Sequence, residues 1–510
     1  MASARDLVVG IDSSTQSTKA IAWTREGRAE AEGRAPLSLS NPKLFHFEQE
    51  PEDWWRACVT ALKELFSQVD AGRVAALAIS NQRETVAFLD DTGRSIRPAI
   101  VWLDERARQE VGDLSAELGA ETIHRITGRY PDITPCVYSY LWMKRHEAES
   151  FARTACFADV QTFLVHRLCG QFKTGWISAD PMGLFDLQQK QWSEEILAAL
   201  GLDAAQMPRV YPPGDCLGEV SGEAAAATGL RAGTPIFAAG GDGQLAGLGT
   251  NCTTSDRAYI NLGTAVVSGV WSPVYAYDRA WRTEIAAQGE GYILENCLRS
   301  GAFLINWFVD QFTPGGREDP EIFKRLEEAA NAIPRGSEGL MALPYWSGVM
   351  DPHWDSAARG CLIGFGGGHG PAHVYRALIE GMTLDQVMRG ELLERNAGLE
   401  IKEYLAIGGG AASPLWRQML ADASGKAVLI SDTVEASALG AGMIAAYGAG
   451  WYGSIVEAAE AMAGATTAVQ PDPATWEDYR ELLEIYRGLY ETTAATSRKL
   501  VAFASKGTEA

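Results

Sequence analysis

Short apolar runs, polar turns and longer segments of helical periodicity alternate along most of this chain. Residues 6–12 and 19–24 are two apolar runs separated by hydroxylic residues over 13–18, which predicts a strand–turn–strand unit. Pro51 begins a segment whose apolar residues recur every three or four positions, as on the buried face of a helix. Residues 74–79 are continuously apolar and predict a buried strand. This alternation favours an α/β fold over an all-α or all-β fold.

The strand–turn–strand pattern returns at residues 258–268, which we interpret as the start of a second, similarly built domain. Single hydrophobic cores stop growing at about 250–300 residues, so a chain of 510 residues is long enough for two. We predict domains at residues 1–250 and 251–510. Near the end, the periodicity of residues 476–502 predicts one long amphipathic helix packed on the body.

Composition and charge narrow the classes of function. A formal net charge of −21 argues against a general binder of nucleic acid or anionic membranes. It leaves room for an anionic substrate, because backbone amides and a metal ion can set the field at one site. No apolar segment reaches the ~18 residues of a membrane span, and no signal-peptide pattern opens the chain. Eight scattered cysteines without a CxxC pair are typical of a reducing cytoplasm.

A lone carboxylate, Asp242, lies among glycines directly after the apolar run 234–238. Glycines let backbone and ligand approach closely. A carboxylate in that position can act as a general base that takes a proton from a substrate hydroxyl. The same Gly-Asp-Gly pattern also occurs in turns without any catalytic role, so its meaning depends on the other segments.

A first phosphate-binding candidate is the turn after residue 12. Its amides and hydroxyls can surround phosphate oxygens, and Asp12 at the strand end can hold Mg²⁺ through water. The turn residues concerned are Ser14, Thr15, Gln16 and Lys19. A plain β-hairpin with a polar turn is the alternative.

Two further glycine-rich segments lie in the second half. Gly263 and Thr264 offer an amide and a hydroxyl in the turn of the second strand–turn–strand unit. Later, a strand runs into a glycine-rich stretch and then a helix, which places bare backbone and a helix N-terminus beside an anion or an adenine face. That stretch contains Gly409, Gly410, Ala411 and Ser413. It is neither a P-loop nor a dinucleotide fingerprint.

A polar cluster follows the strand at 74–79. Charged groups and a tryptophan at strand ends can bind a polyhydroxylated molecule through hydrogen bonds and an apolar wall. The candidates are Gln82, Arg83, Glu84, Trp102 and Asp104. A surface ion-pair cluster is the alternative.

Together these segments resemble the FGGY family of carbohydrate kinases, and the likeness runs through nearly the whole chain. Residues 12–19 resemble the family's first phosphate loop, and Gly241 with Asp242 resembles its catalytic-base segment. Further ordered likenesses occur at residues 48–55, 360–380, 408–422 and 435–441. Six ordered matches are far more specific than any one of them.

The resemblance implies a two-domain α/β fold of the actin-like, ribonuclease-H-like ATPase type, with a cleft between the domains. It implies Mg²⁺- and ATP-dependent phosphorylation of a hydroxyl on a small sugar or polyol. Asp242 would be the general base, with Asp12 and Asp242 facing Mg²⁺. The two turns and the glycine-rich stretch would bind ATP, and the polar cluster would bind the acceptor. Positioning and charge neutralisation dominate such phosphoryl transfer.

The acceptor is less well defined by the resemblance. Residues 81–85 and Trp102 resemble glycerol kinases, but Gly243 stands where those carry Gln, and Cys136 where they place Tyr. Residues 343–355 are nearer to xylulokinase-type members. We expect a ketopentose such as xylulose, or a glycerol- or tetritol-like polyol.

Two questions of partners and class stay open at this point. A homodimer is compatible with the resemblance. The alternative function is a nucleotide-regulated actin-like ATPase or binding module without a sugar acceptor, because actin-like folds host both. The acceptor cluster beside Asp242 favours the kinase, since a pure ATPase would not need it.

Overall fold

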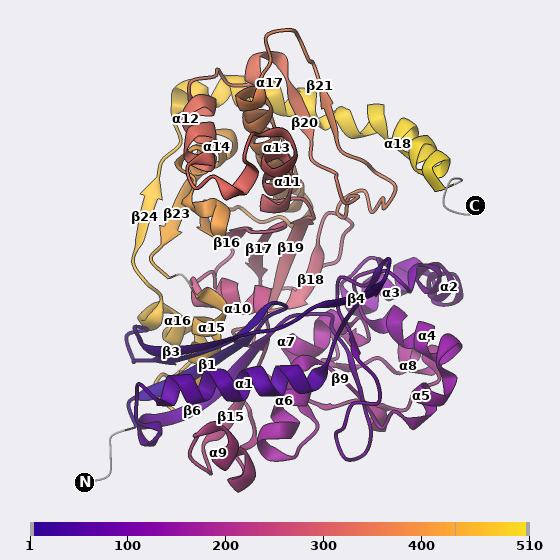
Figure 1. Ribbon diagram of the computed structural model, residues 1–510, viewed down its shortest axis with the longest axis vertical. Helices are drawn as coiled ribbons and strands as arrows, with labels where there is room; N and C mark the ends of the chain where they lie inside the picture. The colour runs from indigo at the N-terminus through magenta and orange to yellow at the C-terminus, as the bar shows by residue number, and fades with distance from the viewer. Residues whose placement is uncertain (1–4, 434, 506–510) are drawn as a thin grey trace.

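The computed structural model describes residues 5–433 and 435–505, which form two sheets with helices around them (Figure 1). The first sheet has six strands in the order β14-β15-β6-β1-β2-β3, and the second has seven in the order β18-β19-β17-β16-β22-β23-β24. The strands of the first sheet are β1 (Leu7–Ser13), β2 (Ser17–Trp23), β3 (Ala29–Pro36), β6 (Val74–Asn81), β14 (Cys216–Glu219) and β15 (Pro235–Gly241). Those of the second are β16 (Arg257–Leu262), β17 (Val266–Ser272), β18 (Arg282–Ile285), β19 (Tyr292–Leu298), β22 (Glu403–Ile407), β23 (Ala427–Ser431) and β24 (Thr466–Val469).

Both sheets follow the same plan. In the first, β1 pairs antiparallel with β2 and parallel with β6; in the second, β16 pairs antiparallel with β17 and parallel with β22. The two predicted strand–turn–strand units are therefore confirmed, and each turn follows a strand with an antiparallel neighbour on one side and a parallel neighbour on the other. The predicted strand at 74–79 is β6, which continues two residues further.

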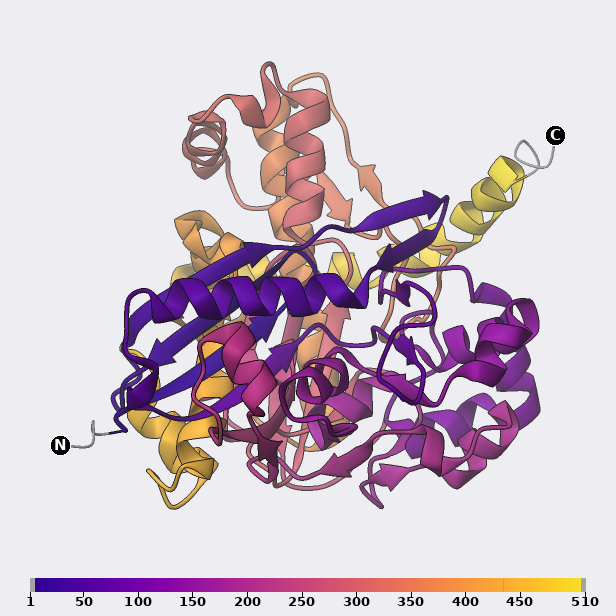
Figure 2. The ribbon, with the colours of Figure 1, turned by 60° about the horizontal axis from the view of Figure 1, so that its bottom comes forward.

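Helices cover both faces of the first sheet. One face is covered by α1 (Pro51–Phe66), α6 (Val160–Cys169) and α9 (Gly222–Thr228), and the other by α10 (Asp242–Gly249), α15 (Ala436–Gly448) and α16 (Ile455–Met462). Because β1 alternates its side chains, Val8 packs with the second set and Leu7 and Val9 with the first. Helix α1, drawn in indigo across the sheet in Figure 2, buries Trp54 and Leu62 as its periodicity predicted.

The remaining elements form a lobe beside the first sheet and a layer around the second. The lobe contains α2 (Arg108–Leu118), α3 (Ala120–Thr127), α4 (Val137–His146), α5 (Ala148–Arg153), α7 (Trp176–Ala179) and α8 (Glu194–Leu200). The second sheet carries α11 (Ala302–Phe312), α12 (Ile322–Asn331), α13 (Pro371–Ala397), α14 (Pro414–Ser424), α17 (Trp476–Arg487) and α18 (Leu489–Ser505). The short strands are β4 (Ser40–Lys43), β5 (His46–Gln49), β7 (Ala87–Leu89), β8 (Ala99–Ile100), β9 (Cys156–Ala158), β10 (Lys173–Gly175), β11 (Phe185–Asp186), β12 (Gln191–Trp192), β13 (Arg209–Tyr211), β20 (Met341–Leu343) and β21 (Cys361–Ile363).

Helix α15 comes from the second half of the chain but packs against the first sheet (Figure 1). The contact is made backbone to backbone: a Cβ on Gly10 of β1 would lie 1.9 Å from the carbonyl oxygen of Ala438, and a Cβ on Gly249 of α10 would lie 2.0 Å from that of Ala436. Glycine is required there because any side chain would separate the elements. Helices α15 and α16 therefore pack against the first sheet although they come from the second half of the chain.

The prediction of one helix over 476–502 is wrong in one respect. The segment forms two helices, α17 and α18, which meet at Gly488. Glycine is a poor helix former, by about 1 kcal/mol relative to alanine, and the amide of Gly488 bonds the carbonyl three residues back instead of four. Packing on the body extends along α18 to Ser497, beyond which Leu500 and Phe503 are exposed and the helix projects outward (Figure 2).

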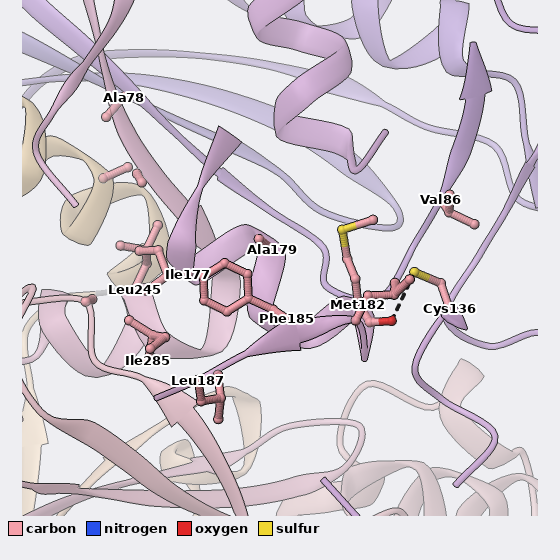
Figure 3. Packing of buried hydrophobic residues seen from close by; sticks show 14 of the residues in the cluster. Ala78, Val86, Cys136, Ile177, Ala179, Met182, Phe185, Leu187, Leu245 and Ile285 are labelled. Carbon is pink, nitrogen blue, oxygen red and sulfur yellow. Dashed lines mark hydrogen bonds between the residues drawn. The ribbon is translucent and has the colours of Figure 1, made fainter. Parts of the chain in front are cut away.

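A shared hydrophobic core joins the two halves near the centre of the molecule. Figure 3 shows Ile285 of β18 among Leu245 of α10 and the lobe residues Ile177, Phe185 and Leu187. The same figure shows Cys136, whose thiol donates to the carbonyl of Met182 across 3.6 Å. Within the described ranges, no helix has both the length and the apolar character needed to cross a bilayer.

Candidate active site

Asp242 lies at the junction of β15 and α10 and is the first residue of the helix. Its Oδ1 accepts a hydrogen bond of 2.8 Å from the amide of Gly243, and a helix N-terminus favours a negative charge. The side chain is 38% exposed, although the strand before it and the helix after it are mostly buried. Asp242 is thus held by a strand–helix junction with its carboxylate accessible, which distinguishes it from a simple turn.

Asp12 faces Asp242 from the end of β1. Its Oδ1 accepts a hydrogen bond of 2.8 Å from the hydroxyl of Ser80, its neighbour across the parallel pair. Burial, followed by the negative charge of Asp242, raises the pKa of Asp12 to about 7. Burial also raises the pKa of Asp242, and the guanidinium of Arg83 opposes that rise. Two predicted site carboxylates therefore share one electrostatic environment.

The turn after Asp12 is tight and is linked to the other half of the chain. The amide of Ser14 bonds the carbonyl of Ser17 at 3.0 Å, which closes the turn. Nζ of Lys19 lies 2.5 Å from a carboxylate oxygen of Glu435, the residue before α15. The predicted phosphate-binding ammonium is thus already paired with a carboxylate, and a phosphate would compete with Glu435 for it.

The two glycine-rich segments of the second half lie against each other. A Cβ on Gly408 would be 2.3 Å from Oδ1 of Asn261 and 3.1 Å from the amide nitrogen of Gly263. Gly408 has a φ of +82°, which favours glycine, and nothing lies within 4 Å of a Cβ on Gly409. Gly409 therefore presents open backbone next to the exposed Thr264.

Other residues of these segments support the local structure. Ser413 caps α14: its hydroxyl accepts from the amide of Trp416 at 3.1 Å and donates to Glu327 at 2.8 Å. A Cβ on Gly410 would lie 2.7 Å from the ring of Trp416, and Ala411 is buried. The amides at the start of α11 bond the carbonyls of Gly263 and Thr264 at 2.7 and 2.8 Å, which fixes the second turn.

Arg83 is held beside Asp242 by carboxylates of the second half. Its Nη1 donates to Glu284 of β18 at 2.6 Å and to Glu295 of β19 at 3.2 Å. Its Nε lies 3.4 Å from Oδ1 of Asp242. The neighbouring Glu84 has a φ of +62°, a conformation that non-glycine residues rarely adopt and that often marks functional sites.

A buried ion network surrounds this pair, and sequence reasoning missed most of it. Arg129 bonds Glu84 at 3.1 Å, Asp180 at 3.2 Å and Glu284 at 2.7 Å. Arg282 bonds Glu295 at 2.5 Å. The sequence contains one pattern that could have predicted part of this network. Arg282 and Glu284 occupy alternate positions of a short strand and so share one face.

Charge in the network is unevenly distributed. Burial opposes ionisation of Glu295, but Arg282 and Arg83 outweigh it and lower its pKa to about 2. Burial and the neighbouring Glu284 raise the pKa of Asp180 to about 8, against the effect of Arg129. The network therefore keeps Glu295 ionised as a partner for Arg83.

The other residues predicted to bind the acceptor molecule differ in whether their polar atoms are already hydrogen-bonded within the protein. Nε1 of Trp102 donates to the hydroxyl of Thr15 at 2.9 Å, which places a half-exposed indole against the first turn. Gln82 is buried, and its oxygen accepts from the same hydroxyl at 3.2 Å. Asp104 accepts from the amide of Phe47 at 2.6 Å and from Arg106 with both oxygens. Its lone pairs are engaged, so Asp104 orders the loop that carries Trp102.

One hollow lies beside these elements, and a second lies apart from them. A small one opens beside the network and is lined by Glu84, Arg129, Tyr130, Asp132, Thr134, Pro135, Arg282, Met350 and Trp354. A larger one, of about 580 Å³, lies between the segment 334–339 and α17 and contains none of the predicted site residues. The smaller hollow is the one that borders a predicted acceptor residue, Glu84, and the buried ion network. Within the described part of the chain, no three His, Cys, Asp or Glu side chains are grouped to hold a metal ion.

Comparison with known proteins covers almost the whole chain. The model described as the FGGY family of carbohydrate kinases, N-terminal domain, matches residues 7–249, and its C-terminal counterpart matches residues 252–449. The xylulose kinase of Bacillus subtilis is 30% identical over 501 residues, which cover 97% of this chain and 99% of that protein. The glycerol kinase of Aromatoleum aromaticum is 30% identical over 89% of this chain and 92% of its own length.

Solved structures give the same answer for the fold. The crystal structure of xylulose kinase from Rhodospirillum rubrum superimposes with a TM-score of 0.90 at 26% identity, covering 96% of this chain and 99% of that one. Ligand-bound xylulose kinase from Lactobacillus acidophilus gives a TM-score of 0.91 at 24% identity over 97% and 99%. The predicted two-domain, actin-like α/β architecture is confirmed.

Proposed function

The chain belongs to the FGGY family of carbohydrate kinases, and from that premise we propose that it transfers the γ-phosphoryl group of ATP to a hydroxyl of a small ketose or polyol. We take a ketopentose such as xylulose as the leading acceptor, because full-length relatives are named xylulose kinases. The observation that carries the proposal is the accessible carboxylate of Asp242 beside the anchored guanidinium of Arg83.

In the proposed reaction Asp242 acts as the general base. Its carboxylate takes the proton of the acceptor hydroxyl as that oxygen forms a bond to the γ-phosphorus. The bond between the γ-phosphorus and the bridging oxygen of ATP breaks, and ADP leaves with that electron pair. A correctly placed base contributes about 10²–10⁴ in rate. Arg83 and the indole of Trp102 would orient the acceptor, and Glu84 would bind a further hydroxyl beside the small hollow.

The nucleotide would lie between the turns of the two halves. We assign the phosphates to Ser14, Thr15, Gln16 and Lys19 on one side and to Gly263 and Thr264 on the other. The open backbone of Gly409 would face the adenosine, and Gly410, Ala411 and Ser413 would support that surface.

The site chemistry fits Mg²⁺, held by Asp12 and Asp242. Burial and the negative charge of Asp242 both raise the pKa of Asp12, and a divalent cation would offset that charge. Mg²⁺ at kinase sites takes one or two carboxylates plus phosphates and water. Bound Mg²⁺ would supply positive charge that offsets the charge of the triphosphate. We further propose a cytoplasmic location, where ATP is available, and retain a homodimer as a prediction.

An ADP-release panel tests the proposal. Purified protein with Mg-ATP is supplied in turn with ketopentoses, aldonic acids, glycerol and tetritols, and acceptor-dependent ADP release is expected for a ketopentose or short polyol. Phosphorylated product is then identified by mass spectrometry. ATP hydrolysis that no acceptor accelerates would instead support the alternative, a nucleotide-regulated ATPase or binding module.

A further inference from the structure

Arg83 lies directly over the two glycines that flank Asp242. A Cβ on Gly243 would be 2.8 Å from Cζ and Nη2 of Arg83, and a Cβ on Gly241 would be 2.9 Å from its Cδ and Cγ. Real Cβ atoms do not approach other heavy atoms this closely, so a side chain at position 243 and the observed guanidinium exclude each other.

The glycine at 243 is needed for space and not for backbone conformation. Gly243 is the second residue of α10, and its φ is not in the left-handed region. Alanine would suit this helical backbone better than glycine does. The feature that requires glycine here is therefore the guanidinium across from it.

The guanidinium is fixed from the opposite domain. Glu284 and Glu295 are fully buried, and both bond Nη1, at 2.6 and 3.2 Å. Charge-assisted hydrogen bonds of this kind are the strong ones in proteins. With Nη1 committed to them and Nε near Asp242, Nη2 has no hydrogen-bond partner among the residues that the structure describes. Nη2 lies 2.8 Å from the position of a Cβ on Gly243, the residue that follows Asp242 in the chain.

We propose that Gly243 and Glu284 are positioning residues, which hold the guanidinium of Arg83 beside Asp242 with Nη2 free to bind an oxygen of the acceptor. A guanidinium only donates hydrogen bonds, so Nη2 would bind a hydroxyl or carbonyl oxygen. This inference rests on the proposed kinase function and assigns positioning roles to two residues outside the predicted site.

Gly243→Ala is the direct test, assayed with D-xylulose as the acceptor. The added methyl group must displace the guanidinium from Asp242, so KM for D-xylulose is expected to rise about tenfold or more, the range for loss of a charged hydrogen bond. The KM for ATP should be unchanged. A lower melting temperature is also expected, because the displaced guanidinium weakens its hydrogen bonds to the buried Glu284 and Glu295.

Glu284→Gln tests the anchor, with Glu290→Gln as its matched control. Both residues lie in the β18–β19 hairpin segment, but Glu290 is exposed and its side chain is not part of the network. Glu284→Gln is expected to raise KM for D-xylulose and leave KM for ATP unchanged, whereas Glu290→Gln should change neither. If Glu284→Gln lowers the melting temperature below the assay range, Gly243→Ala alone decides.

A double variant separates this mechanism from a general disturbance. In an Arg83→Lys background no guanidinium opposes the new methyl group, so adding Gly243→Ala should change the acceptor KM less than twofold. Acceptor KM values that stay at wild-type levels in Gly243→Ala and Glu284→Gln would overturn the inference while the kinase assignment stands. A wild-type protein that phosphorylates no acceptor would overturn the proposed function itself.

Discussion

Replacing Asp242 by asparagine removes the proposed base while preserving its surroundings. Asparagine has the same shape, and its side-chain oxygen can still accept the 2.8 Å hydrogen bond from Gly243. Arg83 keeps its bonds to Glu284 and Glu295, so the buried network remains intact. The change therefore isolates the proton acceptor from the scaffold that holds it.

The expected loss follows from the role of the carboxylate. Removing a placed general base lowers kcat by about 10²–10⁴, equivalent to about 3–5 kcal/mol in the activation barrier. The assay is acceptor-dependent ADP release at saturating ATP, with ATP affinity measured separately by calorimetry. Asp215→Asn, at an exposed position before β14, is the matched control and should retain full activity.

One result would refute the assignment of the base. A kcat for Asp242→Asn within threefold of wild type, at saturating acceptor, would show that the acceptor hydroxyl loses its proton elsewhere. A large loss that appears only in ATP affinity would place Asp242 in nucleotide or metal binding and not in proton transfer.

Three further predictions concern stability and nucleotide binding. Burial lowers the pKa of His124 to about 4, so below pH 6.5 this histidine binds a proton in the unfolded chain but not in the folded protein. The free energy of unfolding should therefore fall by about 2 kcal/mol between pH 7 and pH 5. Urea unfolding of His124→Gln should show a smaller fall. Glu435→Gln frees the ammonium of Lys19 from its 2.5 Å ion pair and should lower KM for ATP up to about fivefold, measured at saturating acceptor. Gly249→Ala places a methyl group 2.0 Å from the carbonyl oxygen of Ala436 and should destabilise the fold by about 1–3 kcal/mol, seen as a lower melting temperature.

Each of these has a clear contrary outcome. Gly222→Ala, at a helical glycine with open space around it, is the control for Gly249→Ala, and equal melting temperatures for the two would contradict the close packing of α15. The same pH dependence in wild type and His124→Gln would assign the acid sensitivity to other groups. An unchanged or higher KM for ATP in Glu435→Gln would mean that Lys19 does not bind the phosphates of ATP.

Local pattern predicted the elements whose determinants are close in sequence. The β1–β2 and β16–β17 units, the strand at 74–79 and helix α1 follow from apolar runs, hydroxylic or glycine turns and a proline at a helix start. Asp242 was found in the same way, because a carboxylate among glycines is conspicuous on its own. The break at Gly488 was missed because one glycine lowers helix propensity without disturbing the amphipathic pattern.

The amino-acid sequence by itself determined the two-domain α/β plan, the family and the lone carboxylate, because these depend on periodicity, turn chemistry and ordered motifs within short stretches of chain. Only the tertiary structure decided that α15 returns to the first sheet, that Glu435 pairs with Lys19, and that Glu284 and Glu295 hold Arg83 against Asp242. Such contacts join residues some two hundred to four hundred positions apart. Nothing in the local sequence around one partner specifies the other, because the attraction between the opposite charges arises only when folding brings them together.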